Sequence, residues 1–266
     1  MFNGFRAFAW RMGRKLYFWG RGEQHNSPEA NGEYWLLAEV VRLSPPHATF
    51  MDIGANKGDW SLEALKRSMV AGRPISLHAF EPCTGTRQIL EARLPDGASA
   101  RINALAMSSK PGETEFYSSG AGSGTNSLHQ VSGTEIERVQ VSTIDEYLKS
   151  NNIDRVELVK VDTEGFDLEV LRGAESALAE GKIGVVQFEY NWRWLLNRAS
   201  LLQVFQLIAG TPYRFGRLMD GEIKTYDQWH FELDRYFEGN YVLIHVDSTL
   251  NQACRPVEFN QHNVGI

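Results

Sequence analysis

The chain alternates short, continuously apolar runs with longer segments in which apolar residues recur every three or four positions. The apolar runs predict strands at 48–53, 74–80, 100–106, 156–161 and 183–189. The periodic segments predict helices at 33–43, 59–70, 84–94, 144–150, 166–179 and 201–209. Further short β-like runs lie at 115–117, 138–141, 213–218 and 241–246. Strands that alternate with helices pair in parallel, so we predict an α/β domain whose mostly parallel sheet has helices on both faces.

The first 22 residues follow a different, amphipathic pattern. Residues spaced alternately three and four apart would share one face of a helix; they are Phe2, Phe5, Ala9, Met12, Leu16 and Trp19. Arg11 and Arg14 would lie roughly opposite, and no acidic residue occurs in this segment. Two interpretations stay open: the helix packs on the domain or on a second copy of the chain, or it attaches to a membrane surface near a lipid-linked acceptor.

Composition and charge narrow the classes of function. We divide the chain into a basic amphipathic extension (1–32), a main domain (33–250) and a C-terminal tail (251–266). The net charge is −6, so nucleic acid is not an expected partner. Two cysteines, Cys83 and Cys254, indicate free thiols rather than a disulfide framework. No apolar run reaches 18 residues. We expect a cytoplasmic protein, with peripheral membrane contact through residues 1–22 as the alternative.

The loop after the first predicted strand has the composition of a ligand-binding loop. In MDIGANKGDWS, Gly54 and Gly58 bracket a turn between a strand that ends at Asp52 and a helix. The spacing differs from the GxGxxG pattern of dinucleotide folds. Glu81 ends the second strand, where a carboxylate can accept hydrogen bonds from both ribose hydroxyls of an adenosine. Asp52 suits an ammonium group better than a pyrophosphate, which favours S-adenosylmethionine over NAD.

Six blocks of the sequence resemble the FkbM-type S-adenosylmethionine-dependent methyltransferases. They are DIGANKGDWS (52–61), AFEP (79–82), INALAMSS (102–109), STIDEYL (142–148), VKVDTEGFDLEVLRGA (159–174) and QFEYN (187–191). The resemblance implies a class I methyltransferase fold, Rossmann-like, with seven strands of which the last is antiparallel. By position, it implies that the methionine end of the cofactor is held by Asp52, Gly54, Asn56 and Gly58. It also implies that Glu81 holds the ribose and that Asn103 to Leu105 border the adenine. It also implies methylation of an oxygen, often on a sugar, glycolipid or polyketide product.

Methyl transfer to a hydroxyl needs a group that takes the hydroxyl proton. Asp162 and Glu164 end the fourth strand and Glu189 ends the fifth, so their side chains would meet near the cofactor. Two hypotheses compete. In the first, one of these carboxylates, or His129 from a glycine-rich loop, is the general base, and Asp162 also borders the cofactor. In the second, Asp162, Glu189 and Asn191 bind Mg²⁺, although this metal is not favoured.

Several candidates also have a purely structural interpretation. Glu164 is as well placed to cap the following helix as to bind an acceptor. Asp167 and Glu169 are expected on a solvated helix face. The aromatic residues from Tyr190 to Trp194 are expected mainly to pack in the core or a lid, and His230 is expected to be structural.

The function we expect is O-methylation of a hydroxyl on a sugar, glycolipid or glycosylated small molecule. Alternatives from other classes are an NAD(P)-dependent oxidoreductase with a Rossmann fold and a non-catalytic cofactor-binding protein. Acceptor specificity should lie where the resemblance is weakest, in residues 118–135 and 192–240.

Overall fold

The computed structural model describes residues 2–22, 26–95, 97–118 and 135–265. The α-helices are α1 (Phe2–Arg21), α2 (Glu33–Leu43), α3 (Asp59–Val70), α4 (Thr84–Arg93), α5 (Ile144–Ser150), α6 (Asp167–Arg172), α7 (Glu175–Ala179) and α8 (Leu201–Leu207). The strands are β1 (Ala48–Ile53), β2 (Ile75–Phe80), β3 (Ala100–Asn103), β4 (Leu105–Met107), β5 (Gly112–Ser118), β6 (Glu135–Ser142), β7 (Val156–Val161), β8 (Ile183–Tyr190), β9 (Tyr213–Met219), β10 (Glu222–Tyr226), β11 (Gly239–His245) and β12 (Cys254–Pro256). Two short 3-10 helices are η1 (Trp192–Asn197) and η2 (Thr249–Ala253).

The central sheet has the strand order β12-β10-β9-β11-β8-β7-β1-β2-β3. Strands β3, β2, β1, β7 and β8 pair in parallel, whereas β11 runs antiparallel to both β8 and β9. Seven of these strands, from β9 to β3, form the arrangement expected from the resemblance, with the last of them along the chain, β11, antiparallel. The α/β fold class is therefore confirmed, but β10 and β12 extend the sheet to nine strands among the described residues.

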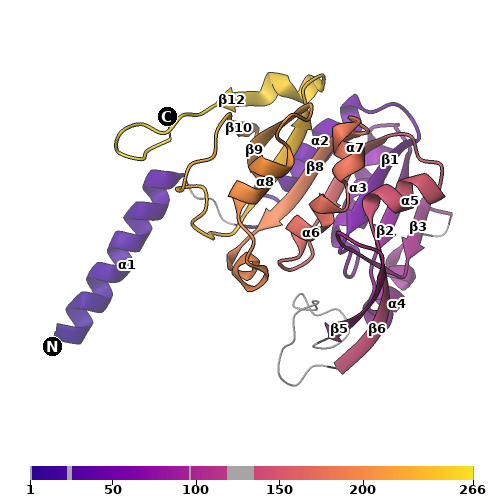
Figure 1. Ribbon diagram of the computed structural model, residues 1–266, viewed down its shortest axis with the longest axis horizontal. Coiled ribbons are helices and arrows are strands. Elements are labelled where there is room, and N and C mark those ends of the chain that lie inside the picture. Colours follow the sequence, from indigo (N-terminus) through magenta and orange to yellow (C-terminus); the bar gives the residue numbers. More distant parts are fainter. Residues whose placement is uncertain (1, 23–25, 96, 119–134, 266) are drawn as a thin grey trace.

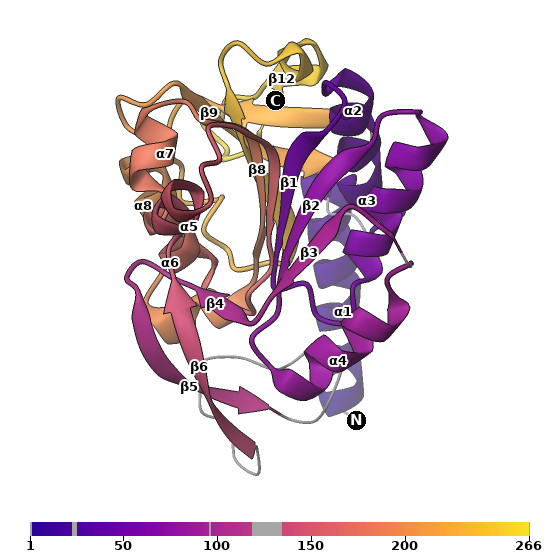
Figure 2. The ribbon, with the colours of Figure 1, turned by 90° about the vertical axis from the view of Figure 1, so that its right-hand side faces the viewer.

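Helices cover both faces of the sheet, as the alternating pattern predicts. Figure 2 shows α5 to α8 on one face and α2, α3 and α4 on the other. The strands are apolar toward both layers: Phe50, Leu77 and Leu158 pack toward α2 and α3, whereas Met51 and Val159 pack toward the opposite layer. All five side chains are buried. Burial on both faces explains why the central strands read as unbroken apolar runs.

The predicted strand 100–106 is two strands that belong to different sheets. Chain direction changes after Asn103, whose side-chain amide donates to the carbonyls of Ala79 and Arg101. Beyond this turn, β4 leaves the central sheet and pairs with β6, which also pairs antiparallel with β5. The three strands form a separate small sheet beside the carboxyl ends of the central strands (Figure 2). The β-like runs at 115–117 and 138–141 are its longer strands, β5 and β6.

The predicted helix 166–179 is interrupted between α6 and α7. A Cβ on Gly173 would lie 2.1 Å from the carbonyl oxygen of Ser108, so the chain passes too closely there for another residue. The side chain of Asp145 accepts hydrogen bonds from the backbone N–H groups of Ser176 and Ala177, in the first turn of α7. These partners come from distant segments, so the break leaves no signal in the local periodicity.

Both ends of the chain add to the edges of the domain. The tail contributes β12, in which Cys254 to Pro256 pair parallel with β10. Helix α1 is confirmed as a helix and projects away from the body (Figure 1). None of the helices described combines the length and hydropathy that crossing a bilayer requires. The division into residues 1–32, 33–250 and 251–266 stays a prediction.

Candidate active site

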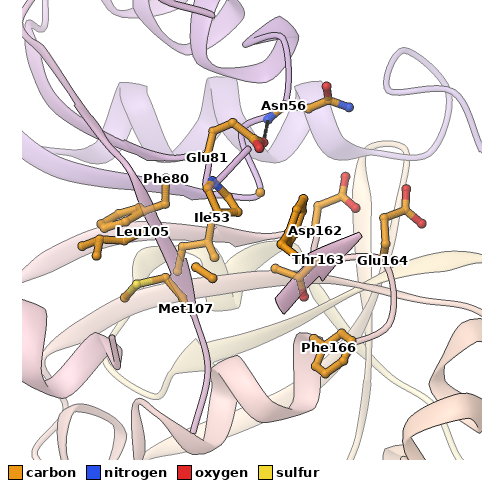
Figure 3. Close-up of a pocket in the computed structure, with 14 residues that line it drawn as sticks. Ile53, Asn56, Phe80, Glu81, Leu105, Met107, Asp162, Thr163, Glu164 and Phe166 are labelled. Atoms are coloured by element: carbon orange, nitrogen blue, oxygen red, sulfur yellow. Dashed lines mark hydrogen bonds between the residues drawn. The ribbon is translucent and has the colours of Figure 1, made fainter. Parts of the chain in front are cut away.

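A cavity opens at the carboxyl ends of β1, β2 and β7, where ligands of open α/β sheets bind. It encloses about 680 Å³, including the part open to solvent. Its wall is formed by Ile53, Gly54, Asn56, Phe80, Glu81, Pro82, Leu105, Ala106, Met107, Phe116, Asp162, Thr163, Glu164 and Phe166. Figure 3 shows Glu81 beside Asn56 on one side, Leu105 and Met107 on a second, and Asp162 with Glu164 on a third.

The glycine loop forms one wall because Gly54 permits a very close approach of two strand ends. Its φ is +82°, and a Cβ there would lie 1.9 Å from the carbonyl oxygen of Asp162. The loop is pinned by the N–H groups of Gly54 and Ala55, which both donate to the carbonyl of Phe80. Only glycine fits at position 54, and the loop backbone is thereby exposed to the cavity.

Asp52 and Gly58 support this loop from behind and do not line the cavity. Asp52 is fully buried, and its Oδ2 accepts a hydrogen bond from the Ser61 hydroxyl of α3 at 2.6 Å. Burial raises the pKa of the Asp52 carboxyl. Gly58 precedes α3 with φ +84°, and a Cβ there would lie 2.3 Å from a methyl carbon of Leu90. The structure places Asp52 behind the loop, and its contact with the ammonium group of a cofactor stays a prediction.

Glu81 lies on the cavity wall at the end of β2, as the sequence predicts. Its Oε2 accepts the N–H of Asn56 at 3.0 Å and its Oε1 accepts the N–H of Cys83 at 2.9 Å. Burial raises the pKa of Glu81 to about 7 despite these bonds. Each carboxylate oxygen has a second lone pair, so the fixed carboxylate can still accept two hydroxyl donors.

Asn103 does not line the cavity, although it was expected to border the adenine. Besides its two backbone acceptors, its Oδ1 accepts a hydrogen bond from the hydroxyl of Tyr147, so the side chain is committed to the turn between β3 and β4. The neighbouring wall is formed by Leu105, Met107 and Phe116 of the small sheet. Met107 and Phe116 are not predictable as cavity residues from the sequence, because their contact with the cavity depends on the strand pairing of that sheet.

Asp162 lines the cavity on the same side as Glu164 and is paired with a buried lysine. Lys160 Nζ lies 3.0 Å from Asp162 Oδ2, and the lysine side chain is only 8% exposed. Although burial opposes its charge, the carboxylates of Asp162, Glu33 and Asp52 raise the pKa of Lys160 above its usual range. Lys160 therefore supplies the positive charge that stabilises the Asp162 carboxylate.

Glu164 faces the cavity from a strained turn and does not cap α6. Its φ is +55°, and Gly165 follows at +103°. Arg193 Nη1 lies 3.0 Å from Glu164 Oε2 as a charge contact without hydrogen-bond geometry, so this buried oxygen keeps its lone pairs available. Burial and the neighbouring Asp162 raise the pKa of Glu164 to about 7, and Arg193 lowers it in part. A carboxyl with this pKa is suited to act as a base near neutral pH.

Asp167 corrects the prediction of a solvated helix face. It is 1% exposed, and its Oδ2 accepts the N–H of Gly165 at 3.2 Å. Burial, followed by the charge of Asp162, raises the pKa of Asp167 to about 8. The signal available in the sequence was its place two residues after a glycine in the first turn of a helix, where an aspartate supports the turn. Glu169, by contrast, pairs with Ser109 and Arg172 near the surface.

Glu189 and Asn191 lie beside the cavity but are engaged with each other. Asn191 Nδ2 donates to Glu189 Oε2 at 2.9 Å, and Asn191 Oδ1 accepts the N–H of Arg193. Burial and the surrounding acids, Asp162 first among them, raise the pKa of Glu189 well above its usual value. Of the expected Mg²⁺ ligands, Asp162 is already paired with Lys160. The described part of the chain contains no group of three or more His, Cys, Asp or Glu side chains placed to hold a metal.

The remaining candidates divide between the core and the surface. Tyr190 and Trp194 are fully buried, as core packing requires, whereas Trp192 is 55% exposed. His230 stacks on Phe259 with ring centroids 4.1 Å apart and does not line the cavity. His129 lies outside the described residues.

The chain is similar to known methyltransferases. The Methyltransferase FkbM domain matches residues 52–215. The hexuronic acid methyltransferase AglP of Haloferax volcanii is 28% identical over 161 residues, which cover 60% of this chain and 63% of that protein. A methyltransferase FkbM from Methylobacillus flagellatus superposes with a TM-score of 0.47 at 17% identity, over 73% of this chain and 43% of that chain.

A SAM-dependent O-methyltransferase from Thermotoga maritima superposes with a TM-score of 0.42 at 9% identity, over 84% of this chain and 67% of that chain. The part of AglP that matches is slightly less than two thirds of its length. The FkbM match, in contrast, spans more than half of this chain and includes the glycine loop, Glu81 and the turn at Glu164. The chain therefore belongs to the FkbM methyltransferase family.

Proposed function

We propose that this methyltransferase uses S-adenosylmethionine to methylate a hydroxyl group of a sugar or a glycosylated molecule, with Glu164 as the general base. The observation that carries the proposal is that one cavity has Glu81 on one wall and Glu164 on another, with the glycine loop and Asp162 between them. A ribose-binding acid and a base are thus separated by the backbone that would hold the reacting end of the cofactor.

The residues on the wall fit the proposed cofactor. Glu81 keeps lone pairs for two ribose hydroxyls, and Leu105, Met107 and Phe116 offer an apolar surface for an adenine. Two polar atoms of the wall, Asn56 Oδ1 and Thr163 Oγ1, are buried without a hydrogen-bond partner in the described part of the protein. A ligand with donors there would satisfy them. Bound S-adenosylmethionine would supply a methyl group on a sulfonium, and transfer would leave a neutral thioether.

Glu164 is the group we assign to the hydroxyl proton. As the new carbon–oxygen bond forms, the proton passes from the acceptor oxygen to a carboxylate oxygen of Glu164. Arg193 keeps part of the Glu164 population ionised near neutral pH, because its charge lowers a pKa that burial raises. Asp162 is less suited to this role because the Lys160 ammonium lies 3.0 Å from its Oδ2. We assign Asp162 to positioning the reacting groups.

A sugar is the acceptor class that the surroundings of Glu164 support. Trp192, next to Arg193, presents an exposed indole ring, and such rings stack on the apolar face of sugars. The matched relative is named a hexuronic acid methyltransferase. Because the match covers only part of that protein, a uronic acid is one acceptor to test among other sugars.

Incubation with deuterated-methyl S-adenosylmethionine and a panel of hexoses, hexuronates and their glycosides tests this proposal. We expect a mass increase of one labelled methyl group in a sugar product, and NMR should place that methyl on oxygen. Absence of S-adenosylhomocysteine binding by calorimetry would contradict the cofactor assignment. A label on nitrogen would contradict O-methylation.

A pair of variants separates the two acids. Glu164→Gln should reduce kcat by about a hundredfold or more, with unchanged affinity for S-adenosylhomocysteine, because general bases typically contribute factors of about 10² to 10⁴. Glu81→Gln should weaken S-adenosylhomocysteine binding by roughly tenfold or more, because a charged hydrogen-bond acceptor is lost. Calorimetry and steady-state kinetics on both variants give the comparison. The base assignment is wrong if Glu164→Gln turns over normally.

A further inference from the structure

We propose that α1 binds the surface of an anionic lipid bilayer and holds the enzyme there. This inference does not depend on the reaction or on its acceptor. The residues that carry it form one apolar stripe along the helix, spaced three or four apart: Phe5, Phe8, Met12, Leu16 and Trp19. Their exposed fractions range from 42% for Met12 to 82% for Trp19. The stripe therefore does not pack on the domain, whereas packing on a second copy of the chain is decided by the experiment below.

The contacts of α1 with the domain come from the opposite face of the helix. Arg21 pairs with Glu232 at 2.6 Å, and the hydroxyl of Tyr17 donates to the same carboxylate. Phe18 packs edge-on against Phe237 with ring centroids 4.9 Å apart. These contacts involve the last turns only, so the helix is attached at its C-terminal end while the stripe faces away from the attachment.

The charges of α1 match an anionic surface. The helix carries Arg6, Arg11, Arg14, Lys15 and Arg21 and no acidic residue, although the whole chain has a net charge of −6. On a helical projection, Lys15 borders the stripe and Arg6 lies farther round on its other side, so these long side chains can extend toward phosphates while the apolar side chains enter the interface. Trp19, on the stripe itself, belongs to the residue type enriched at membrane interfaces. The chain's overall negative charge does not favour this contact, so the local basic patch must supply the attraction.

Helix α1 extends toward the end of the molecule where the candidate cavity lies. In both Figure 1 and Figure 2, α1 and the β5–β6 pair extend toward the same end of the molecule, below the central sheet. The carboxyl ends of β1, β2 and β7, where the cavity lies, are at that end.

Co-sedimentation of the full chain with vesicles tests the inference. We expect binding to phosphatidylcholine vesicles that contain phosphatidylglycerol, little binding to phosphatidylcholine alone, and weakening at high salt. The triple variant Phe5→Gln, Leu16→Gln, Trp19→Gln should abolish binding. A second triple variant, Arg6→Gln, Arg11→Gln, Lys15→Gln, should weaken it roughly a hundredfold, because each charge contributes about 1 kcal/mol. Glutamine keeps helix propensity, and circular dichroism verifies that both variants fold.

A matched control removes exposed apolar side chains elsewhere. Met69→Gln with Val70→Gln, at the end of α3, changes two side chains that are 78% and 84% exposed, and vesicle binding should be unchanged. Sedimentation velocity without lipid tests the alternative that a second copy of the chain binds the stripe. The proposal is overturned if the wild type dimerises through the stripe and binds no vesicles. Equal binding to neutral and anionic vesicles would also overturn it.

Discussion

Glu164 combines an unusual backbone with an unusual charge environment. Its φ of +55° belongs to a region that costs a non-glycine residue about 1 kcal/mol or more. The turn persists because its neighbours hold it: the side chain of Asn197 donates to the carbonyl of Gly165 at 2.7 Å, and a Cβ on Gly165 would lie 2.9 Å from that of Arg193. Helix η1 thus fixes the backbone that directs this carboxylate into the cavity.

Arg193 should set the pH at which Glu164 becomes a base. The proposed mechanism requires the ionised carboxylate of Glu164, so it predicts that kcat/KM rises with pH through an apparent pKa near 7. Arg193→Gln removes a charge that lowers this pKa, so the midpoint should move upward by about one pH unit. Arg193→Lys should restore most of the shift because it keeps the charge. The measurement is kcat/KM against pH for the three proteins.

A surface arginine supplies the control for this shift. Arg172 pairs with Glu169 on α6, and Arg172→Gln should leave the midpoint in place. An unchanged midpoint in Arg193→Gln would show that Glu164 is not the titrating base.

The sequence predicts those site residues whose place follows from a strand end. Gly54, Glu81, Asp162 and Glu164 all line the cavity, because the carboxyl ends of parallel strands meet at one edge of the sheet. Asn103 also lies at a strand end, but it does not line the cavity because its side-chain amide donates to the carbonyls of Ala79 and Arg101. Other roles depend on partners that are distant in sequence.

Lys160 shows why such partners cannot be predicted from the local sequence. It interrupts an apolar strand, and the charges that explain it come from Glu33, Asp52 and Asp162. Two of these acids lie more than 100 positions away. Local patterning gives no indication that they converge on this lysine.

The glycine loop offers a direct test of whether ligand binding depends on the close approach of β1 and β7 at their carboxyl ends. Gly54→Ala would place a methyl group 1.9 Å from the backbone oxygen of Asp162. Both backbones are held by strand hydrogen bonds, including the N–H of Asp162 to the carbonyl of Ile53 at 2.9 Å. We expect the loop to move and affinity for S-adenosylhomocysteine to fall at least roughly tenfold, about 1.4 kcal/mol. Calorimetry reports the affinity and thermal unfolding reports the stability.

Gly72 is the matched control for this substitution. Its φ of +63° is also left-handed, but a Cβ there would meet nothing within 4 Å. Gly72→Ala should therefore show only the backbone cost, about 1 kcal/mol, without any change in ligand affinity. Equal effects of the two substitutions would show that the close approach at Gly54 is unimportant.

Elements were predictable where burial alone decides their pattern. The strands β1 and β7 begin and end at the predicted residues because both faces are covered and polar residues bound them. The small sheet was harder, since β5 and β6 depend on each other: Gly112 to Ser118 pair with Glu135 to Val141 across a long intervening segment. Strand β10 was missed because its alternation of polar and apolar residues extends over only five positions.

Buried acidic side chains are concentrated around one end of the sheet. Burial is the largest cause that raises the pKa of Glu33, Asp52, Glu81, Glu164, Asp167 and Glu189. An acid with a raised pKa binds its proton more readily in the folded state than in the unfolded chain. Its contribution to stability is therefore full at low pH and is lost as the pH rises through the folded pKa. The shared direction means that these groups act together on the stability of the ligand-free protein.

We predict that the free energy of unfolding falls as the pH rises through neutrality, and that Asp167 accounts for a measurable share. With a pKa of about 8 in the folded state and about 3.9 when unfolded, Asp167 is protonated in the native protein at neutral pH. Asp167→Asn should thus cost less stability there than Asp167→Ala. Between about pH 6 and about pH 9, the Asp167→Asn variant should also lose less free energy of unfolding than the wild type, by roughly 1 to 3 kcal/mol. Urea unfolding gives these values, with the exposed Asp154→Asn as control. An Asp167→Asn protein with the wild-type pH dependence would show that the native carboxyl is already ionised.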